Sequence, residues 1–141
     1  MKKIIIINGP NLNLLGEREV ELYGTKTLKE IEKECCEIFK NDELSLNFFQ
    51  SNSESEIIDK IHICKNYDGM IINAGAFTHT SIAIHDALKM VKIPKIEVHI
   101  SNIYNREEFR KNSFISPVVN GIIAGFGTHV YQVAINSLKY L

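Results

Sequence analysis

The chain has 141 residues, of which 45% are hydrophobic and 23% are charged, and its formal net charge is −1. This length and composition predict a single globular domain over residues 1–141. The near-neutral charge gives no electrostatic reason to expect nucleic acid or an anionic membrane as a partner, and no run approaches the roughly 18 apolar residues of a membrane span.

The first expected element is a buried strand. Residues 4–7 are four consecutive isoleucines, which cannot alternate between a buried and an exposed face, so they indicate a parallel strand covered on both sides. Gly9 and Pro10 end it. Residues 11–24 then fit neither helix nor strand, and a long irregular loop in a compact domain is often a functional lid. Within it, Arg18 is a cation that can favour the ionised form of the Tyr23 phenol.

Strands and helices are expected to alternate after this loop. Thr27 and Ser53 each begin a capping-box sequence, and Thr80 or Ser81 can cap a later helix. Period-2 and helical spacings of apolar residues locate the remaining elements. The expected strands lie at 44–50, 69–73, 95–100 and within 118–126, and the expected helices lie near 28–39, 54–64, 82–91, 106–112 and 129–141.

This alternation predicts an α/β fold, namely a flavodoxin-like doubly wound five-stranded parallel sheet with helices on both faces. In such sheets, ligands bind beyond the carboxyl ends of the strands. Three of the expected strands are followed by polar residues, which form the sets Asn8 and Asn11, then Asn73, Thr78 and His79, then His99, Ser101 and Asn102. We therefore expect one site at that edge of the sheet.

Several familiar chemistries lack their motifs. There is no phosphate-binding G-x-x-x-x-G-K-[ST], no G-x-G-x-x-G and no G-x-S-x-G nucleophile turn. Glu97 and His99 lie on one face of a strand and could be metal ligands, but no third ligand is evident. A carboxylate beside His99 also fixes the tautomer of the imidazole.

The candidate residues also have ordinary structural interpretations. A histidine such as His79 in a polar loop is commonly just solvated. Arg106 and Arg110 are compatible with a charged surface shared with neighbouring glutamates, Tyr23 with a packed aromatic residue, and Asp86 with the solvent-facing side of a helix.

The combination of motifs nevertheless resembles one family. Five stretches in order, covering essentially the whole chain, are similar to type II 3-dehydroquinate dehydratases. They are Asn8-Gly9-Pro10-Asn11-Leu12, then Arg18 with Tyr23-Gly24, then Asn73-Ala74-Gly75 with Thr78-His79-Thr80-Ser81, then Glu97-Val98-His99-Ile100-Ser101-Asn102, then Arg106-Glu107-Glu108-Phe109-Arg110.

The resemblance implies a reaction and a catalytic set. The family has the flavodoxin-like fold and converts 3-dehydroquinate to 3-dehydroshikimate and water, by anti elimination through an enolate. By that resemblance Tyr23 removes the proton from carbon 2, while Arg18 favours the phenolate and stabilises the developing charge. Asn11 helps hold a water against the enolate oxygen. His99 donates the proton with which the carbon 1 hydroxyl leaves, and Glu97 orients His99.

The resemblance also implies the binding residues. Asn73 is expected to contact the substrate near the departing hydroxyl, and backbone groups of Ile100 and Ser101 are expected to hold its carboxylate. His79 and Arg110 are expected to bind the ring hydroxyls.

The family further implies a dodecamer built from four trimers. Asp86 matches a residue that reaches the site of a neighbouring subunit, and Arg106 matches a position that steadies the lid. No cofactor and no metal are expected.

Two other functions remain open at this point: a flavodoxin-like binder of nucleotide or flavin, and a catalytically silent assembly protein. The missing phosphate loop argues against the first, and the joint presence of Arg18, Tyr23 and His99 argues against the second.

The cysteines bear on cellular location. Cys35, Cys36 and Cys64 are odd in number and lack metal-ligand spacing, which is typical of reduced thiols. The apolar run after Met1 is shorter than the roughly seven residues of a signal-peptide core. We therefore expect a cytoplasmic protein.

Overall fold

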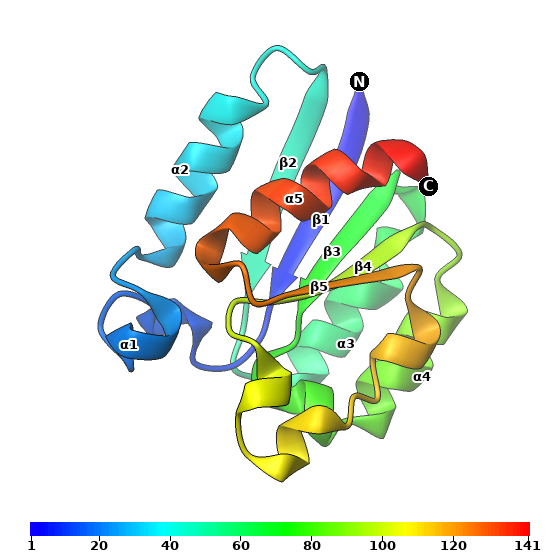
Figure 1. The fold of residues 1–141 in the computed structure, drawn as a ribbon. Coiled ribbons are helices and arrows are strands. Elements are labelled where there is room, and N and C mark those ends of the chain that lie inside the picture. The colour runs from blue at the N-terminus through cyan, green and yellow to red at the C-terminus, as the bar shows by residue number, and fades with distance from the viewer.

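In the computed structural model, which describes residues 1–141, five parallel strands form one sheet in the order β2-β1-β3-β4-β5 (Figure 1). The strands are β1 (Lys2–Asn8), β2 (Leu44–Gln50), β3 (Gly69–Asn73), β4 (Lys95–His99) and β5 (Gly121–Ala124). The chain runs from β1 outward to β2 and returns to β3 on the other side of β1. The strand order therefore reverses between β1 and β3, and the predicted flavodoxin-like fold is confirmed.

Helices cover both faces of the sheet. Helices α2 (Leu28–Ile38) and α5 (Val130–Ser137) lie on one face, and α3 (Glu54–His62) and α4 (Ile82–Met90) lie on the other (Figure 1). None of the helices combines the length and the apolar character that crossing a membrane would require. The predicted caps are confirmed, because the side chains of Thr27, Ser53 and Ser81 accept hydrogen bonds from the third backbone N–H after each of them.

The isoleucine run at residues 4–7 is buried on both sides, as predicted. Ile4 and Ile6 belong to the apolar core beneath α2 and α5, whereas Ile5 and Ile7 belong to the core beneath α3 and α4. All four side chains are at most 3% exposed. One strand thus joins two cores, and it places Asn8 at the carboxyl edge of the sheet.

Strand β4 forms where the alternating sequence predicts a strand, and all five of its residues are buried. Both edges of the strand are paired, with β3 and β5, and its two faces are covered by α5 and by the segment that holds Ser113 and Ser116. Ile96 and Val98 enter the core beneath α5, and the alternate residues Glu97 and His99 are buried as polar groups. The alternation therefore separates an apolar side from a buried polar side.

The prediction that residues 11–24 form neither helix nor strand is wrong in part. A 3₁₀ turn spans Leu12–Leu14 and a short helix, α1, spans Val20–Tyr23. The residues before these turns, Asn11 and Glu19, have positive φ angles of 69° and 35°. These backbone reversals let two very short helical turns form where the sequence has no helical period.

Two other predicted helices are shorter than expected. Within residues 106–112 the structure has only a 3₁₀ helix at Glu108–Lys111, and α5 is followed by a 3₁₀ turn at Leu138–Tyr140. The first lacks a buried apolar stripe, since none of its residues is buried. Without such a stripe, tertiary packing does not extend a helix.

The turns after β1 and β3 lie directly against each other. A Cβ added at Gly9 would come within 2.4 Å of the Ala74 carbonyl oxygen. The Gly9 N–H also donates a hydrogen bond of 2.7 Å to the Asn73 carbonyl. Only glycine fits at this contact, which closes the sheet between β1 and β3 at its carboxyl edge.

Candidate active site

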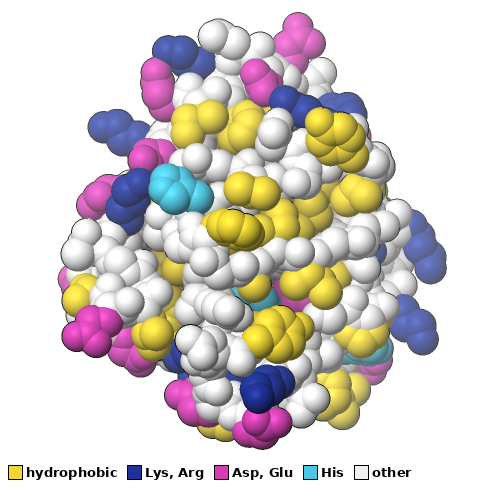
Figure 2. Space-filling model, in the orientation of Figure 1, with side chains coloured by type: hydrophobic (Ala, Val, Ile, Leu, Met, Phe, Trp, Pro, Cys, Tyr) yellow, Lys and Arg dark blue, Asp and Glu magenta, His cyan; other side chains and the backbone are white.

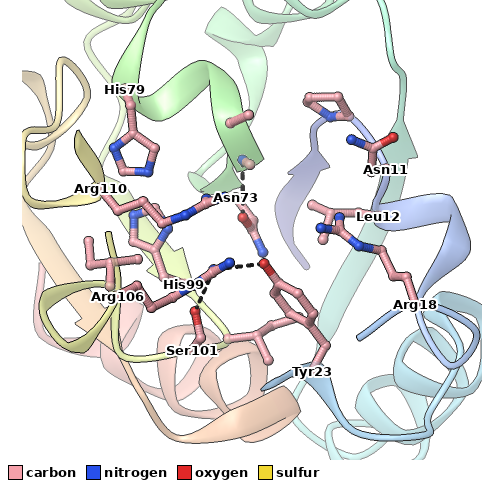
Figure 3. A pocket seen from close by; sticks show the side chains of 15 residues that line it. Asn11, Leu12, Arg18, Tyr23, Asn73, His79, His99, Ser101, Arg106 and Arg110 are labelled. Atoms are coloured by element: carbon pink, nitrogen blue, oxygen red, sulfur yellow. Dashed lines mark hydrogen bonds between the residues drawn. The ribbon is translucent and has the colours of Figure 1, made fainter. Parts of the chain in front are cut away.

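A pocket opens at the carboxyl edge of the sheet, where the sequence predicts a ligand site (Figure 3). Nine of the eleven predicted site residues line it: Asn11, Arg18, Tyr23, Asn73, His79, His99, Ile100, Ser101 and Arg110. They come from the turn after β1, the segment 11–24, the ends of β3 and β4, and the 3₁₀ helices that follow these two strands.

The charge of the lining is one-sided. Three arginines, Arg18, Arg106 and Arg110, contribute to the wall, and no aspartate or glutamate is among the lining residues. Two histidines, His79 and His99, complete the ionisable groups apart from Tyr23. A pocket with this lining favours an anionic ligand.

Tyr23 is the only phenol in the pocket. Its side chain is buried, and its hydroxyl oxygen accepts a hydrogen bond of 2.7 Å from Nη1 of Arg106 (Figure 3). The Arg18 guanidinium instead lies over the face of the Tyr23 ring, 4.7 Å from its centroid. Two cations therefore flank one phenol, and the one that contacts the oxygen is Arg106.

Arg106 has a larger role in the site than the sequence indicates. Its side chain is 8% exposed, its Nη1 also donates to Ser101 Oγ at 3.1 Å, and its Nη2 lies 3.8 Å from a Glu19 carboxylate oxygen. It thus joins the segment 11–24 to the end of β4. The neighbouring glutamates made a surface position plausible, and the family resemblance gave Arg106 only the role of steadying the lid.

His99 and Glu97 form a buried pair behind the pocket wall. His99 Nε2 lies 2.5 Å from Glu97 Oε2, so the other ring nitrogen, Nδ1, is the one left for a ligand. Glu97 is completely buried and does not line the pocket. Two hydroxyls also donate to its carboxylate, Ser113 Oγ at 2.9 Å and Ser116 Oγ.

The environment of Glu97 keeps it ionised. Burial by itself raises the pKa of this carboxyl, but hydrogen bonds from His99, Ser116 and Ser113 and the charge of His99 lower it further than burial raises it. The net result is a pKa below the ordinary value. The sequence showed Glu97 beside His99, but isolated serines 16 and 19 residues further on carry no recognisable motif.

His79 stands beside His99 in the pocket. The two rings are nearly parallel, with centroids 6.3 Å apart and an interplanar angle of 22°. Burial lowers the pKa of His79, the hydrogen bond to the Asn112 carbonyl raises it, and the charges of His99 and Arg110 lower it again, so the net shift is downward. Because Nδ1–H of His79 donates to the Asn112 carbonyl, a neutral His79 presents Nε2 as an acceptor for a ligand hydroxyl.

Arg110 is held in place from outside the pocket. Its Nε donates to Glu107 Oε2 at 2.6 Å, and its guanidinium lies over the Phe109 ring. Arg110 and His79 therefore present two polar groups on the same wall of the pocket (Figure 3).

Asn73 is oriented by a buried network that the sequence did not suggest. Its Nδ2 donates to the Tyr131 hydroxyl at 3.0 Å, and its Oδ1 accepts from the Gly75 N–H at 3.2 Å. The Tyr131 hydroxyl in turn donates to Asn8 Oδ1. Burial raises the pKa of Tyr131, so this phenol stays neutral and acts as a fixed bridge between two asparagines.

Asn11 and the residues that follow β4 have polar groups that make no hydrogen bond within the chain. The Asn11 N–H donates to Asn52 Oδ1 at 2.9 Å, which fixes the backbone while its side chain makes no hydrogen bond within the chain. The backbone N–H groups of Ile100 and Ser101 likewise have no acceptor in the chain. Two adjacent free amides beside an arginine are a suitable binding place for a carboxylate.

Asp86 does not line the pocket of its own chain. It is exposed on α4 and makes no hydrogen bond or ion pair. The sequence places it in a helix after the His79 loop and predicts that it acts across a subunit contact. A single chain does not test that role, which stays a prediction.

The metal hypothesis has no third ligand in the structure. No group of three or more histidine, cysteine, aspartate or glutamate side chains is placed to hold a metal ion. His99 Nε2 and both oxygens of Glu97 already have hydrogen-bond partners. The cysteines are free thiols, and none lines the pocket.

Comparison with known proteins identifies relatives along nearly the whole chain. Residues 2–139 match the family model described as dehydroquinase class II. A 3-dehydroquinate dehydratase of Caldicellulosiruptor saccharolyticus is 58% identical over 147 residues, covering 99% of this chain and 97% of that protein. One from Prochlorococcus marinus is 55% identical over 139 residues, with coverages of 98% and 95%. The crystal structure of a type II dehydroquinase from Butyrivibrio crossotus superposes with a TM-score of 0.96 at 48% identity, covering 98% of this chain and 97% of that one.

Proposed function

The chain belongs to the class II dehydroquinase family, and we propose that the pocket at the carboxyl edge of its sheet is the active site. The protein is a 3-dehydroquinate dehydratase, a hydro-lyase of the shikimate route to aromatic compounds. One observation supports the assignment of the site most strongly: a phenol held by a guanidinium and a histidine held by a buried carboxylate share one arginine-lined pocket.

The pocket suits the substrate, which is a hydroxylated ring with one carboxylate and one ketone. We assign the carboxylate to the free N–H groups of Ile100 and Ser101, with the Arg106 guanidinium adjacent to the Ser101 hydroxyl. We assign the ring hydroxyls to His79 and Arg110, which both line the pocket. Asn73, whose amide is fixed by Tyr131, contacts the substrate near the hydroxyl that leaves.

Tyr23 is assigned as the base. Its phenolate removes the proton on carbon 2, next to the ketone, and the electron pair moves toward the ketone oxygen to give an enolate. The Arg106 guanidinium on the phenol oxygen and the Arg18 guanidinium over the ring both favour the phenolate. Asn11, with its free side chain, holds a water against the enolate oxygen.

His99 is assigned as the acid. Hydroxide is a poor leaving group, so the carbon 1 hydroxyl needs a proton as its bond to carbon breaks. With Nε2 bound to Glu97, the proton comes from Nδ1 of His99. The enolate then re-forms the ketone, now conjugated with the new double bond, and water departs.

The assignment of function has a direct test. The purified protein is mixed with 3-dehydroquinate, and ultraviolet absorbance of the conjugated enone product is followed, with and without EDTA. We expect the same rate in both conditions, and we expect borohydride added with substrate to leave the enzyme active. Loss of activity with EDTA would indicate a metal, and inactivation by borohydride would indicate a Schiff base instead of a phenolate.

The two arginines beside Tyr23 make separable contributions. Arg106→Met removes the cation that touches the phenol oxygen, whereas Arg18→Met removes one from the ring face. Losing either cation removes a group that stabilises the phenolate, so kcat should fall. We expect the larger fall, about tenfold, from Arg106→Met, because it removes the hydrogen bond to the phenol oxygen. A larger fall from Arg18→Met would show that Arg18 is the main partner of the base.

We also propose that the chain assembles as its family does, into trimers and a dodecamer of four trimers. Exposed apolar residues support self-association: Figure 2 shows hydrophobic side chains gathered over α5 and β5, where Ile122, Phe126 and Val133 are 47%, 65% and 42% exposed. β5 also lies at the end of the sheet, with its outer edge unpaired in the chain. The inferred cytoplasmic location stays a prediction.

Asp86 is assigned to the site of a neighbouring subunit, and mixing two inactive chains tests this. One chain carries Asp86→Ala and the other carries Tyr23→Phe. In mixed trimers, a site with intact Tyr23 beside a neighbour with intact Asp86 should regain activity, because cyclic trimers bring different surfaces together. Recovery is measured after co-refolding, against each variant treated alone. Absence of recovery in trimers shown to be mixed would contradict the shared site.

A further inference from the structure

One segment outside the predicted site contacts His79 directly and reaches His99 through Glu97. This clamp segment, residues 112–116, follows the 3₁₀ helix that carries Arg110. The Asn112 carbonyl lies 2.8 Å from His79 Nδ1, and the Ser113 and Ser116 hydroxyls donate to Glu97. The Phe114 N–H donates to the Thr78 carbonyl at 2.9 Å, which ties the segment to the loop of His79.

The Glu97 carboxylate depends on this segment. Its side chain is 1% exposed, so water cannot solvate the charge. Oε1 accepts from Ser116, and Oε2 accepts from Ser113 and from His99. Apart from His99, the ionisable group that interacts with Glu97 is His79 on the loop after β3. A buried carboxylate that loses a hydrogen-bond donor has no water to replace it. The clamp segment therefore determines how readily Glu97 takes up a proton.

We propose that Ser116, supported by Ser113, is a positioning residue that keeps the Glu97 carboxylate charged and thereby holds the His99 ring with Nδ1 turned toward the substrate. The proposal rests on the assignment of His99 as the acid. An ionised Glu97 stabilises the imidazolium, whereas a protonated Glu97 does not. Ser116 therefore acts on the reaction through two intermediaries and touches neither substrate nor the pocket, which it does not line.

Ser116 separates this effect from local folding better than Ser113 does. The Ser113 hydroxyl also accepts hydrogen bonds from the N–H groups of Ile115 and Ser116, so its removal would disturb the turn. The Ser116 hydroxyl has Glu97 as its only partner. Ser116→Ala therefore removes one donor from the carboxylate and leaves the turn intact.

The test compares Ser116→Ala, Ser116→Cys and Ser116→Thr with wild type. Alanine lacks the donor, cysteine keeps the size but donates weakly, and threonine keeps the hydroxyl. With Ala we expect about tenfold lower kcat and little change in KM. Thr should behave as wild type and Cys should lie between them. Ser137→Ala, which alters an exposed hydroxyl on α5, serves as the distant control.

A second readout needs no turnover. The ¹⁵N resonances of the His99 ring are recorded without substrate, and the Ala variant should show ring signals displaced from those of wild type, because the hydrogen bond between His99 Nε2 and Glu97 changes. Unchanged ring resonances and an unchanged kcat in both Ala and Cys variants would overturn the proposal, as would a rise in KM alone. If the wild-type protein failed to dehydrate 3-dehydroquinate, the ring resonances would still test the positioning role, so the two failures are distinguishable.

Discussion

Tyr23→Phe should abolish turnover of 3-dehydroquinate while leaving substrate binding largely intact. The substitution removes one oxygen atom, and the aromatic ring keeps its place in the core beneath α2 and α5. Proton abstraction by a positioned side chain contributes about 10²–10⁴-fold to the rate. Apart from Tyr23, the only general bases that line the pocket are His79 and His99. We therefore expect kcat to fall by at least about 10³-fold.

Binding is measured on the same variant by calorimetry with the substrate, which the variant should not consume. The groups proposed to bind the carboxylate, at Ile100 and Ser101, and the ring hydroxyls, His79 and Arg110, are untouched, so the affinity should stay close to the wild-type KM. The Arg106 guanidinium loses one acceptor but keeps Ser101 and Glu19. Turnover near the wild-type rate would exclude Tyr23 as the base.

His99→Ala should give the second large loss. Without a proton donor, hydroxide must leave from carbon 1 unassisted, so kcat should fall by about 10²–10⁴-fold. Because Tyr23 is unaffected, proton exchange at carbon 2 should continue after elimination has stopped. Solvent deuterium entering the substrate, detected by mass spectrometry, would separate the two steps. No exchange and no elimination together would place His99 in the first step as well.

Glu97→Gln provides the matched comparison. The amide keeps the size of the side chain and an oxygen for the Ser113 or Ser116 hydroxyl, but removes the negative charge beside His99. Its effect should be smaller than that of His99→Ala, because the ring still reaches the pocket. If Glu97→Gln were the more damaging change, the roles assigned to the pair would be wrong.

Much of the fold could be predicted because its signals are local. Four adjacent isoleucines require burial on two sides, and the serine and threonine caps at Thr27 and Ser53 mark helix starts without reference to the rest of the chain. Strands β2 and β3 have the predicted bounds for the same reason. The helical turn that carries Tyr23 could not be predicted, because four residues do not complete a repeat and Glu19 enters it with a positive φ.

The candidate site likewise has one part that the sequence could predict and one part that it could not. Polar residues at strand ends, such as Asn73 and His99, could be predicted because parallel strands bring their carboxyl ends to one edge. The contact of Arg106 with Tyr23 joins positions 83 residues apart, and that of Tyr131 with Asn73 joins positions 58 apart. Such pairs depend on tertiary structure and leave no pattern in a single sequence, which is why the first was taken for a lid contact and the second was missed.

The contact between the turns after β1 and β3 has a consequence for protein redesign. In flavodoxin-like proteins the cleft at the strand-order reversal is where a cofactor's phosphate meets backbone amides. Here Gly9 occupies that cleft against Ala74, with no space for even one methyl group. Grafting a phosphate loop onto this scaffold would therefore require moving two strands apart. Variation of the pocket's outer walls, at positions such as Ile103 or Ala76, is the accessible route to altered substrates.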